Sequence, residues 1–189
     1  IMPKIELLGI AGDMNSLVTA YTKDEASYLK RKTEVLTKLE DIYKEYNPEV
    51  DKRVFETLME LYVKDQQPGN VSPLFQQMLA SQQQTYLAVT ADLYSKTAFT
   101  SFDKIKALLA DSAHKAVEII KQDPATVLYA DMMKTYSGNV SPKLNEMQAS
   151  INQLQRTYMQ AQLEVFKEKR FYPDANSTLR VTSGNVKGY

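Results

Sequence analysis

Apolar residues recur at steps of three and four along most of the chain, a pattern that predicts a series of amphipathic α-helices. The first predicted helix covers Lys4 to Tyr21. Within it, Gly9 and Gly12 predict close approach to a neighbouring helix. Thr22 and Glu25 then have the spacing of a capping box that opens the next helix. The apolar face of the first helix consists of Leu7, Ile10, Met14, Leu17 and Tyr21.

Prolines that follow a small polar residue mark further helix starts, because the polar side chain can cap the helix and proline fits its first position. The pairs are Asn47-Pro48, Ser72-Pro73, Asp123-Pro124 and Ser141-Pro142. Ser101 and Ser112 are predicted to cap two shorter helices. The polar segment Asp65 to Asn70 predicts a clear break in the helical pattern.

A five-residue word, Gly-Asn-Val-Ser-Pro, occurs twice, at 69–73 and at 138–142. It could mark an internal repeat, but the flanking segments do not match. The word also spells a helix end, a loop, a serine cap and a proline at the first helical position. We therefore interpret the two copies as the same helix-boundary signal used twice rather than as an internal repeat.

The last helix has the most regular pattern of the chain. From Ser141, apolar positions alternate steps of three and four without a miss, which is typical of a coiled-coil seam. The seam consists of Leu144, Met147, Ile151, Leu154, Tyr158, Ala161 and Val165. Thirty residues at 1.5 Å each would span about 45 Å. The predicted fold is therefore all-α, an antiparallel multi-helix bundle with this long C-terminal helix as its spine.

The final stretch, Phe171 to Tyr189, departs from the helical pattern. Residues Thr178 to Thr182 alternate polar and apolar side chains, which predicts a half-buried strand or a short hairpin. A lone hairpin is marginal in water, so its apolar face requires a sheet that this chain lacks. We expect a helical domain at 1–170 and, at 171–189, a linker with the first strand of a missing β-barrel domain. Because Ile1 is not an initiator residue, we expect the chain to be an excerpt of a longer protein.

Composition narrows the possible partners. Lys plus Arg and Asp plus Glu both number 23, so the formal net charge is zero. A neutral chain argues against a nucleic-acid partner, because such proteins carry a clustered basic excess. No apolar run approaches the roughly 20 residues of a membrane span. The chain has no cysteine, which excludes disulfides and thiolate metal sites.

The sequence offers no catalytic constellation. His114 is the only histidine, and its neighbours Asp111 and Ser112 are expected to diverge from it at a helix start. No nucleophile elbow and no phosphate-binding glycine loop is present. A metal site would need carboxylates alone, and the Glu-x-x-His pairs of di-iron bundles are missing. We therefore assign no catalytic, cofactor-binding or metal-ligating residue and expect no cofactor.

The tail carries a family resemblance. The string from Tyr172 to Thr182, YPDANSTLRVT, followed by Gly184 to Tyr189, GNVKGY, resembles the bacterial serine dipeptidyl-peptidases that include dipeptidyl-peptidases seven and eleven. The resemblance implies a chymotrypsin-like double β-barrel with an inserted helical domain that caps the active-site cleft. It also implies removal of N-terminal dipeptides from oligopeptides, in the periplasm or at the cell surface of a Gram-negative bacterium. The full-length protein implied by the resemblance can be a homodimer.

On this resemblance, the catalytic histidine and aspartate would precede Ile1 and the nucleophilic serine would follow Tyr189. No catalytic residue is therefore carried onto this chain. One position departs from the family, since Ser183 stands where an aromatic residue is usual. The resemblance predicts a non-catalytic cap of a secreted serine dipeptidyl-peptidase. The alternative is a free-standing helical binding or scaffold module that uses the Gln-rich last helix for a partner helix.

Overall fold

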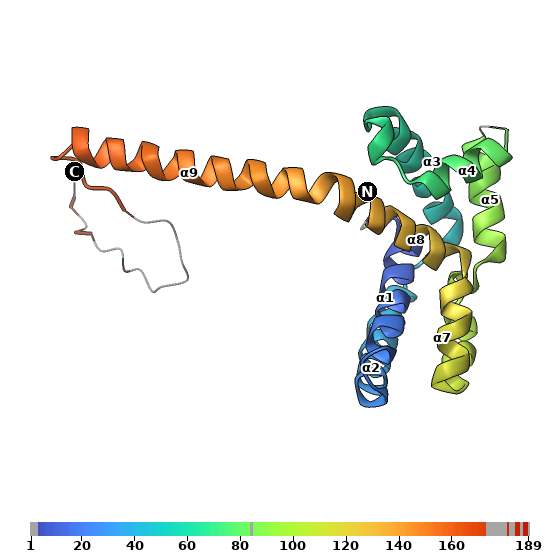
Figure 1. Ribbon diagram of the computed structural model, residues 1–189. Helices are drawn as coiled ribbons and strands as arrows, with labels where there is room; N and C mark the ends of the chain where they lie inside the picture. The colour runs from blue at the N-terminus through green and yellow to red at the C-terminus, as the bar shows by residue number, and fades with distance from the viewer. Residues whose placement is uncertain (1–3, 84, 173–180, 182–183, 186, 189) are drawn as a thin grey trace. The chain divides into compact units, whose positions relative to one another are not determined.

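The computed structural model describes residues 4–83, 85–172, 181, 184–185 and 187–188 (Figure 1). Helices account for all the regular secondary structure in this described part, so the all-α prediction is confirmed there. The predicted strand falls almost wholly outside it and stays a prediction. The α-helices are α1 (Glu6–Tyr21), α2 (Glu25–Ile42), α3 (Pro48–Asp65), α4 (Pro73–Ser81), α5 (Tyr86–Lys96), α6 (Phe102–Ala110), α7 (Ala113–Gln122), α8 (Pro124–Thr135) and α9 (Ser141–Val165). Short 3₁₀ turns are η2 (Pro68–Asn70) and η3 (Ala98–Thr100), and η4 (Tyr136–Val140) is a π-helical turn.

The chain divides into two compact units, Ile1–Lys143 and Leu144–Tyr189. The first contains α1 to α8 and the second contains nearly all of α9. The domain boundary predicted between residues 170 and 171 remains a prediction. None of the described helices is both long and apolar enough to cross a membrane.

Helix α1 forms the centre of the first unit. It packs against α2, α7 and α8, and Figure 1 shows α1 and α2 side by side. The predicted apolar face is confirmed, because four of its five residues are buried and Tyr21 is partly buried. The buried side chains of α1 include Leu7, Leu8, Ile10, Met14 and Leu17. A helix buried on several sides needs apolar residues over most of its surface, as α1 has.

A second group of contacts joins α3, α4 and α5. Phe55 meets the ring of Phe75 at 6.3 Å and that of Tyr94 at 5.8 Å between centroids, both edge to face. Edge-to-face geometry brings the positive edge of one ring to the negative face of the next. These aromatic contacts hold the three helices around a continuous core.

Several predicted helix caps are confirmed. The side chain of Asn47 accepts hydrogen bonds from the N–H groups of Glu49 and Val50 at the start of α3. Ser112 accepts a bond from the N–H of Lys115 at the start of α7. Asp123 caps α8 through the Ala125 N–H at 2.9 Å. In each case a side-chain oxygen satisfies donors that have no partner inside the helix.

Two predicted caps are wrong. Thr22 has helical dihedrals at the end of α1, and its hydroxyl donates to the carbonyl of Thr19. Asp24 caps α2 instead and accepts the Ser27 N–H at 2.6 Å, because it has the extended backbone that a capping residue needs. Ser101 has the position of a cap on α6, but its side chain makes no capping hydrogen bond.

The loop predicted at Gly138 to Ser141 is also wrong. The helix continues from α8 through η4 into α9, and Ser141 has helical dihedrals of −57° and −42° instead of a capping conformation. The N–H of Ser141 bonds to the carbonyl of Tyr136, five residues back. Pro142 lacks an N–H and its ring crowds the carbonyl four residues before it, at Gly138. A widened π turn relieves that crowding without ending the helix.

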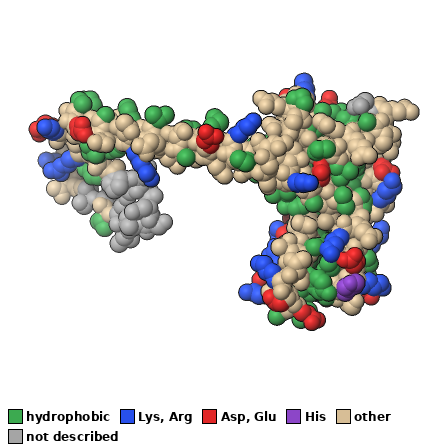
Figure 2. Space-filling model, viewed as in Figure 1, with side chains coloured by type: hydrophobic (Ala, Val, Ile, Leu, Met, Phe, Trp, Pro, Cys, Tyr) green, Lys and Arg blue, Asp and Glu red, His purple; other side chains and the backbone are tan. Residues whose placement is uncertain are grey.

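Helix α9 confirms the prediction of a long C-terminal helix. It contains no buried residue in the part of the chain that the structure describes. The apolar seam predicted as the spine of a bundle is therefore solvent-exposed along its length. Figure 2 shows apolar side chains at intervals along this helix.

Candidate functional site

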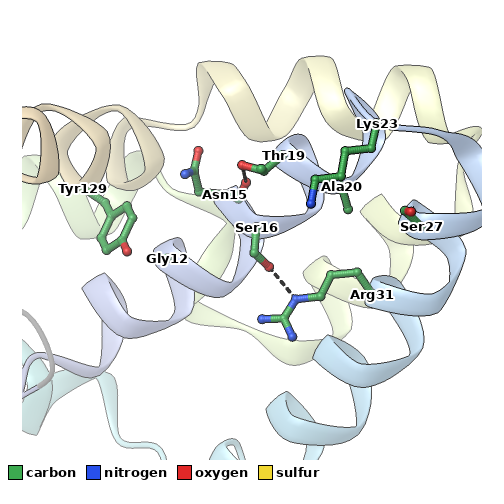
Figure 3. Close-up of a pocket in the computed structure, with 9 residues that line it drawn as sticks. All are labelled: Gly12, Asn15, Ser16, Thr19, Ala20, Lys23, Ser27, Arg31 and Tyr129. Carbon is green, nitrogen blue, oxygen red and sulfur yellow. Dashed lines mark hydrogen bonds between the residues drawn. The ribbon is translucent and has the colours of Figure 1, made fainter.

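A shallow polar groove on α1 and α2 combines charged and hydroxyl side chains (Figure 3). Its volume is about 380 Å³. Most of its lining comes from α1, with Ser27 and Arg31 from α2 and Tyr129 from α8. The remaining lining residues are Gly12, Asn15, Ser16, Thr19, Ala20 and Lys23. This lining could contact a polar ligand.

Arg31 forms one wall of the groove and ties α2 to α1. Its Nε donates to Ser16 Oγ at 2.8 Å, and its Nη1 donates to Glu34 at 3.0 Å. Its Nη2 lies 3.6 Å from Asp13, a carboxylate that also pairs with Lys38 Nζ at 2.7 Å. The Arg31 guanidinium therefore links α1 to α2 and also lines the groove.

Gly12 lets a tyrosine form the opposite wall. A Cβ atom at Gly12 would lie 2.8 Å from the ring of Tyr129, closer than side chains tolerate. The close approach predicted for Gly12 is therefore confirmed, and its neighbour is α8. A Cβ at Gly9 would meet nothing within 4 Å, so the same prediction for Gly9 is wrong.

The serines of the groove are not set up as nucleophiles. Ser16 Oγ donates its proton to the carbonyl of Asp13 at 2.5 Å while it accepts from Arg31. Ser27 Oγ donates to Asp24 at 2.9 Å. The hydrogen bond from the Ser27 N–H lowers the pKa of the Asp24 carboxyl, which makes this carboxylate a weak base. A hydroxyl needs a well-placed base to attack a carbonyl, and the groove supplies none.

The residues considered from the sequence also stay apart. Ser112 Oγ caps α7, and Asp111 pairs with Lys115 Nζ at 2.9 Å. His114 lies exposed on the following turn. The hydrogen bonds and ion pairs of Asp111 and Ser112 therefore do not involve His114. That the chain lacks catalytic residues altogether remains a prediction.

The most buried carboxylate has a structural role. Asp51 on α3 accepts the N–H groups of Glu6 at 2.8 Å and Leu7 at 2.9 Å, so it caps α1 from another helix. Tyr94 also donates to it at 2.7 Å. Burial, together with this hydrogen bond and the Asp51 charge, raises the pKa of the Tyr94 hydroxyl well above its ordinary value.

Two further aspartates join helices in the same way. Asp131 on α8 accepts a hydrogen bond from the Ser72 hydroxyl and one from the Leu74 N–H at the start of α4. Asp123 accepts from Thr97 Oγ1 at 2.8 Å as well as capping its own helix. No group of histidine or carboxylate side chains among the described residues is arranged to hold a metal ion.

These long-range caps had no signal in the sequence. Asp51 and Glu6 are 45 residues apart, and Asp131 and Leu74 are 57 residues apart. A capping pattern can be predicted from sequence only when the cap and the helix are adjacent in the chain. Sequence reasoning therefore missed Asp51 and Asp131, as well as the pairing of Arg31 with Asp13.

Comparison with known proteins matches the whole chain, residues 1–189, to the family described as Peptidase S46. An Asp/Glu-specific dipeptidyl-peptidase of Flavobacterium psychrophilum is 35% identical over the full chain, which covers 26% of that relative. A dipeptidyl-peptidase 7 of Porphyromonas endodontalis is 26% identical over 97% of the chain and 22% of its own length. The chain thus spans about a quarter of the curated relatives that it matches. The chain belongs to the Peptidase S46 family and corresponds to a helical portion of a protein of that family.

Proposed function

We propose that this chain is the non-catalytic helical cap of a serine-type dipeptidyl-peptidase that removes N-terminal dipeptides from oligopeptides. The observation that carries the proposal is the identity of 35% over the full chain with an enzyme described as an Asp/Glu-specific dipeptidyl-peptidase. The serines of the polar groove, which are bonded to a carbonyl and to a weak base, support a role outside the chemical step.

A helical cap suits an exopeptidase on physical grounds. By closing the cleft beyond the first two residues of the substrate, it would restrict cleavage to peptides whose free N-terminus fits the closed site. By opening, it would admit peptides and release products. The proposal places the enzyme in the periplasm or at the cell surface of a Gram-negative bacterium.

The relatives also favour a substrate class. The three Asp/Glu-specific relatives are 35%, 33% and 30% identical to this chain. The three dipeptidyl-peptidase 7 relatives are 26%, 27% and 25% identical. We therefore include in the proposal a preference of the full-length enzyme for peptides with an acidic residue next to the scissile bond.

The test uses the full-length protein encoded around this chain, with the 189-residue chain as control. Fluorogenic dipeptides ending in Asp, Glu, Leu or Lys are compared, each with a free and with an acetylated N-terminus. The full-length protein should cleave free acidic dipeptides at least ~10-fold faster than the others, a difference of about 1.4 kcal/mol in transition-state binding. It should spare the acetylated ones, and the 189-residue chain should cleave nothing.

Cleavage by the 189-residue chain alone would overturn its non-catalytic assignment. An inactive full-length protein, or one that cleaves acetylated peptides equally well, would overturn the dipeptidyl-peptidase proposal. Equal rates on acidic and apolar dipeptides would remove only the substrate preference.

A further inference from the structure

The polar groove exists because short side chains meet where α1 packs against α2. Gly12, Ser16 and Ala20 follow one another at steps of four along α1. Residues four apart lie on the same face of a helix. Ser27 adds another short side chain from α2. These side chains fill little of the space beside the two helices, and the hollow of about 380 Å³ remains.

The charged residues that line the groove are both positive. Lys23 and Arg31 stand among its lining residues, which include no aspartate and no glutamate. Figure 3 shows the Lys23 side chain running back along α1 toward Thr19, while the Arg31 guanidinium reaches from α2 to Ser16. Both cations therefore lie along the same hollow. Such a lining fits an anionic group better than a cationic one.

The carboxylates next to the groove are balanced by other groups. Asp13 pairs with Lys38 Nζ at 2.7 Å, and Glu34 pairs with Arg31 at 3.0 Å. Asp24 caps the N-terminus of α2, where the helix dipole offsets a negative charge. The negative charges around the groove are therefore compensated in the structure without the help of Lys23.

Lys23 is the cation that remains for a ligand. Its ammonium group has no ion pair or hydrogen bond within the part of the chain that the structure describes. A guanidinium has five N–H donors, and three contacts hold Arg31 through Nε, Nη1 and Nη2. Further N–H groups of Arg31 are therefore left, and the Asn15 amide also lines the groove. One unpaired positive charge with N–H donors around it matches a group that has one negative charge and two acceptor oxygens.

The shallow shape of the groove indicates how the ligand is carried. Sites for small free ligands are concave and bury most of the ligand surface. This groove is open along its length, so a bound group would stay partly in solvent (Figure 3). An open groove suits one side chain of a longer peptide, because the peptide backbone can continue over the surface on both sides of it.

We propose that the groove binds the side-chain carboxylate of an acidic peptide. Lys23 pairs with the carboxylate, and the N–H groups of Asn15 and Arg31 donate to its oxygens. A phosphate group has close to two negative charges at neutral pH, which exceeds the single uncompensated cation. The choice of a peptide as the carrier rests on the proposed function, in which the full-length enzyme prefers acidic peptides. A second contact of this kind would raise the effective concentration of such peptides at the enzyme.

The first experiment titrates the isotope-labelled 189-residue chain with the peptide acetyl-Gly-Glu-Gly-amide and follows backbone amide signals by NMR. The signals of Ser16, Thr19 and Lys23 should shift together, with a dissociation constant on the order of 1 mM, since one exposed ion pair contributes little. The uncharged peptide acetyl-Gly-Gln-Gly-amide should bind at least ~5-fold more weakly. No shift of the groove signals up to about 20 mM would overturn the proposal. Equal binding of the glutamine peptide would also overturn it.

Two further titrations separate the possible sources of the anion. Acetyl-triglycine has its carboxylate at the peptide C-terminus only, and inorganic phosphate is not attached to a peptide. Both should bind more weakly than the glutamate peptide. Tighter binding of acetyl-triglycine would overturn the assignment to a side chain, and tighter binding of phosphate would overturn the assignment to a carboxylate.

The second experiment removes the unpaired cation. Lys23→Gln should weaken binding of the glutamate peptide ~3- to 10-fold, because it deletes the ion pair and keeps a side chain of similar length. Lys30→Gln is the matched control, because Lys30 is exposed on α2 outside the groove lining and the net charge changes by the same amount. It should change the dissociation constant less than ~2-fold. Equal weakening by the two variants would indicate attraction to the overall charge and would overturn the site.

A third experiment fills the groove without changing any charge. Ala20→Leu places a larger side chain in the hollow and should weaken binding at least ~5-fold. Ala26→Leu is the matched control, because Ala26 is exposed on α2 outside the lining. Leucine favours helices nearly as well as alanine, so both variants should keep the helical circular dichroism of the parent chain. Undiminished binding by a folded Ala20→Leu chain would overturn the location of the site.

The binding and cleavage experiments fail separately. Binding is measured on the 189-residue chain and needs no cleavage. Carboxylate binding in the groove combined with an inactive full-length protein would overturn only the proposed function. Cleavage by the full-length protein without binding in the groove would overturn only the carboxylate site.

Discussion

The side chain of Asn139 donates a hydrogen bond to the carbonyl oxygen of Gly69, so the two copies of the word Gly-Asn-Val-Ser-Pro lie in contact. The copies adopt different structures. The first forms a 3₁₀ turn and the cap of α4, whereas the second forms the π turn η4 within a continuous helix. One five-residue sequence therefore has two conformations, and tertiary contacts select between them.

The contact between Asn139 and Gly69 predicts an asymmetric effect of mutation. Asn139→Ala should lower the free energy of unfolding by about 0.5–1.5 kcal/mol, because it removes one hydrogen bond. Asn70→Ala is the matched control at the same place in the other copy, where the structure shows no side-chain hydrogen bond among the described residues. It should cost less than ~0.5 kcal/mol. Urea unfolding followed by circular dichroism compares the two, and equal losses would contradict the assigned contact.

Two glycines on α1 should respond to alanine with opposite signs. Gly12→Ala should lower the free energy of unfolding by about 1–3 kcal/mol, because the new Cβ would meet Tyr129 at 2.8 Å. Gly9→Ala should raise it by roughly 0.5–1 kcal/mol, since alanine favours the helix and the added Cβ meets nothing. Thermal unfolding of the two variants measures both changes. Stabilisation by Gly12→Ala would contradict this prediction and show that the Tyr129 ring, at the end of a flexible side chain, turns away at little cost.

Removal of the Asp51 carboxylate should be among the most damaging single changes. Asp51→Ala leaves the Glu6 and Leu7 N–H groups and the Tyr94 hydroxyl without their acceptor. We expect a loss of about 2–4 kcal/mol in the free energy of unfolding. Asp103→Ala removes an exposed carboxylate paired with Lys106 and should cost less than ~0.5 kcal/mol. Chemical denaturation of both variants tests this, and similar losses would show that Asp51 does not cap α1.

Buried tyrosines predict loss of stability in alkali. Burial, with the Asp51 charge, raises the pKa of Tyr43, Tyr46 and Tyr94 in the folded state. Unfolded tyrosines ionise near pH 10, so above that pH the unfolded state loses protons that the folded state keeps. The free energy of unfolding should therefore be steady at pH 8 to 9. It should then fall above about pH 10, by up to ~1.4 kcal/mol per pH unit for each such tyrosine.

Urea titrations at each pH measure this slope. Tyr94→Phe should reduce it by up to ~1.4 kcal/mol per pH unit, since one group no longer titrates. Its stability at pH 8 serves as the reference, because the lost hydrogen bond to Asp51 lowers stability at every pH. A slope unchanged by the substitution would contradict the raised pKa of Tyr94.

Local sequence patterns predicted most of the elements. The structure confirms the helix starts predicted at Asn47-Pro48 and Asp123-Pro124. It also confirms the break in the helical pattern after Asp65. These signals succeed because caps and proline act on the backbone within a few residues. The same signals fail at residues 138–142, where the helix before them continues and a π turn accommodates Pro142.

The candidate groove could not be predicted in the same way. Arg31 and Asp13, and likewise Gly12 and Tyr129, meet only because separate helices pack together. Nothing in the chain near Gly12 identifies Tyr129 as its neighbour. A glycine in a helix predicts a close contact, but the structure alone gives the partner and shows that Gly9 has none.

The sequence by itself determined that the chain is helical, where most helices begin, and that α9 carries an uninterrupted apolar seam, because these properties depend on residues within one or two turns. Its tail also indicated the family to which the whole-chain match assigns it. The tertiary structure decided which carboxylates cap distant helices, how Gly12 receives Tyr129, and that the α9 seam lies exposed. Those features depend on packing between segments tens of residues apart, which the local periodicity of a sequence does not encode.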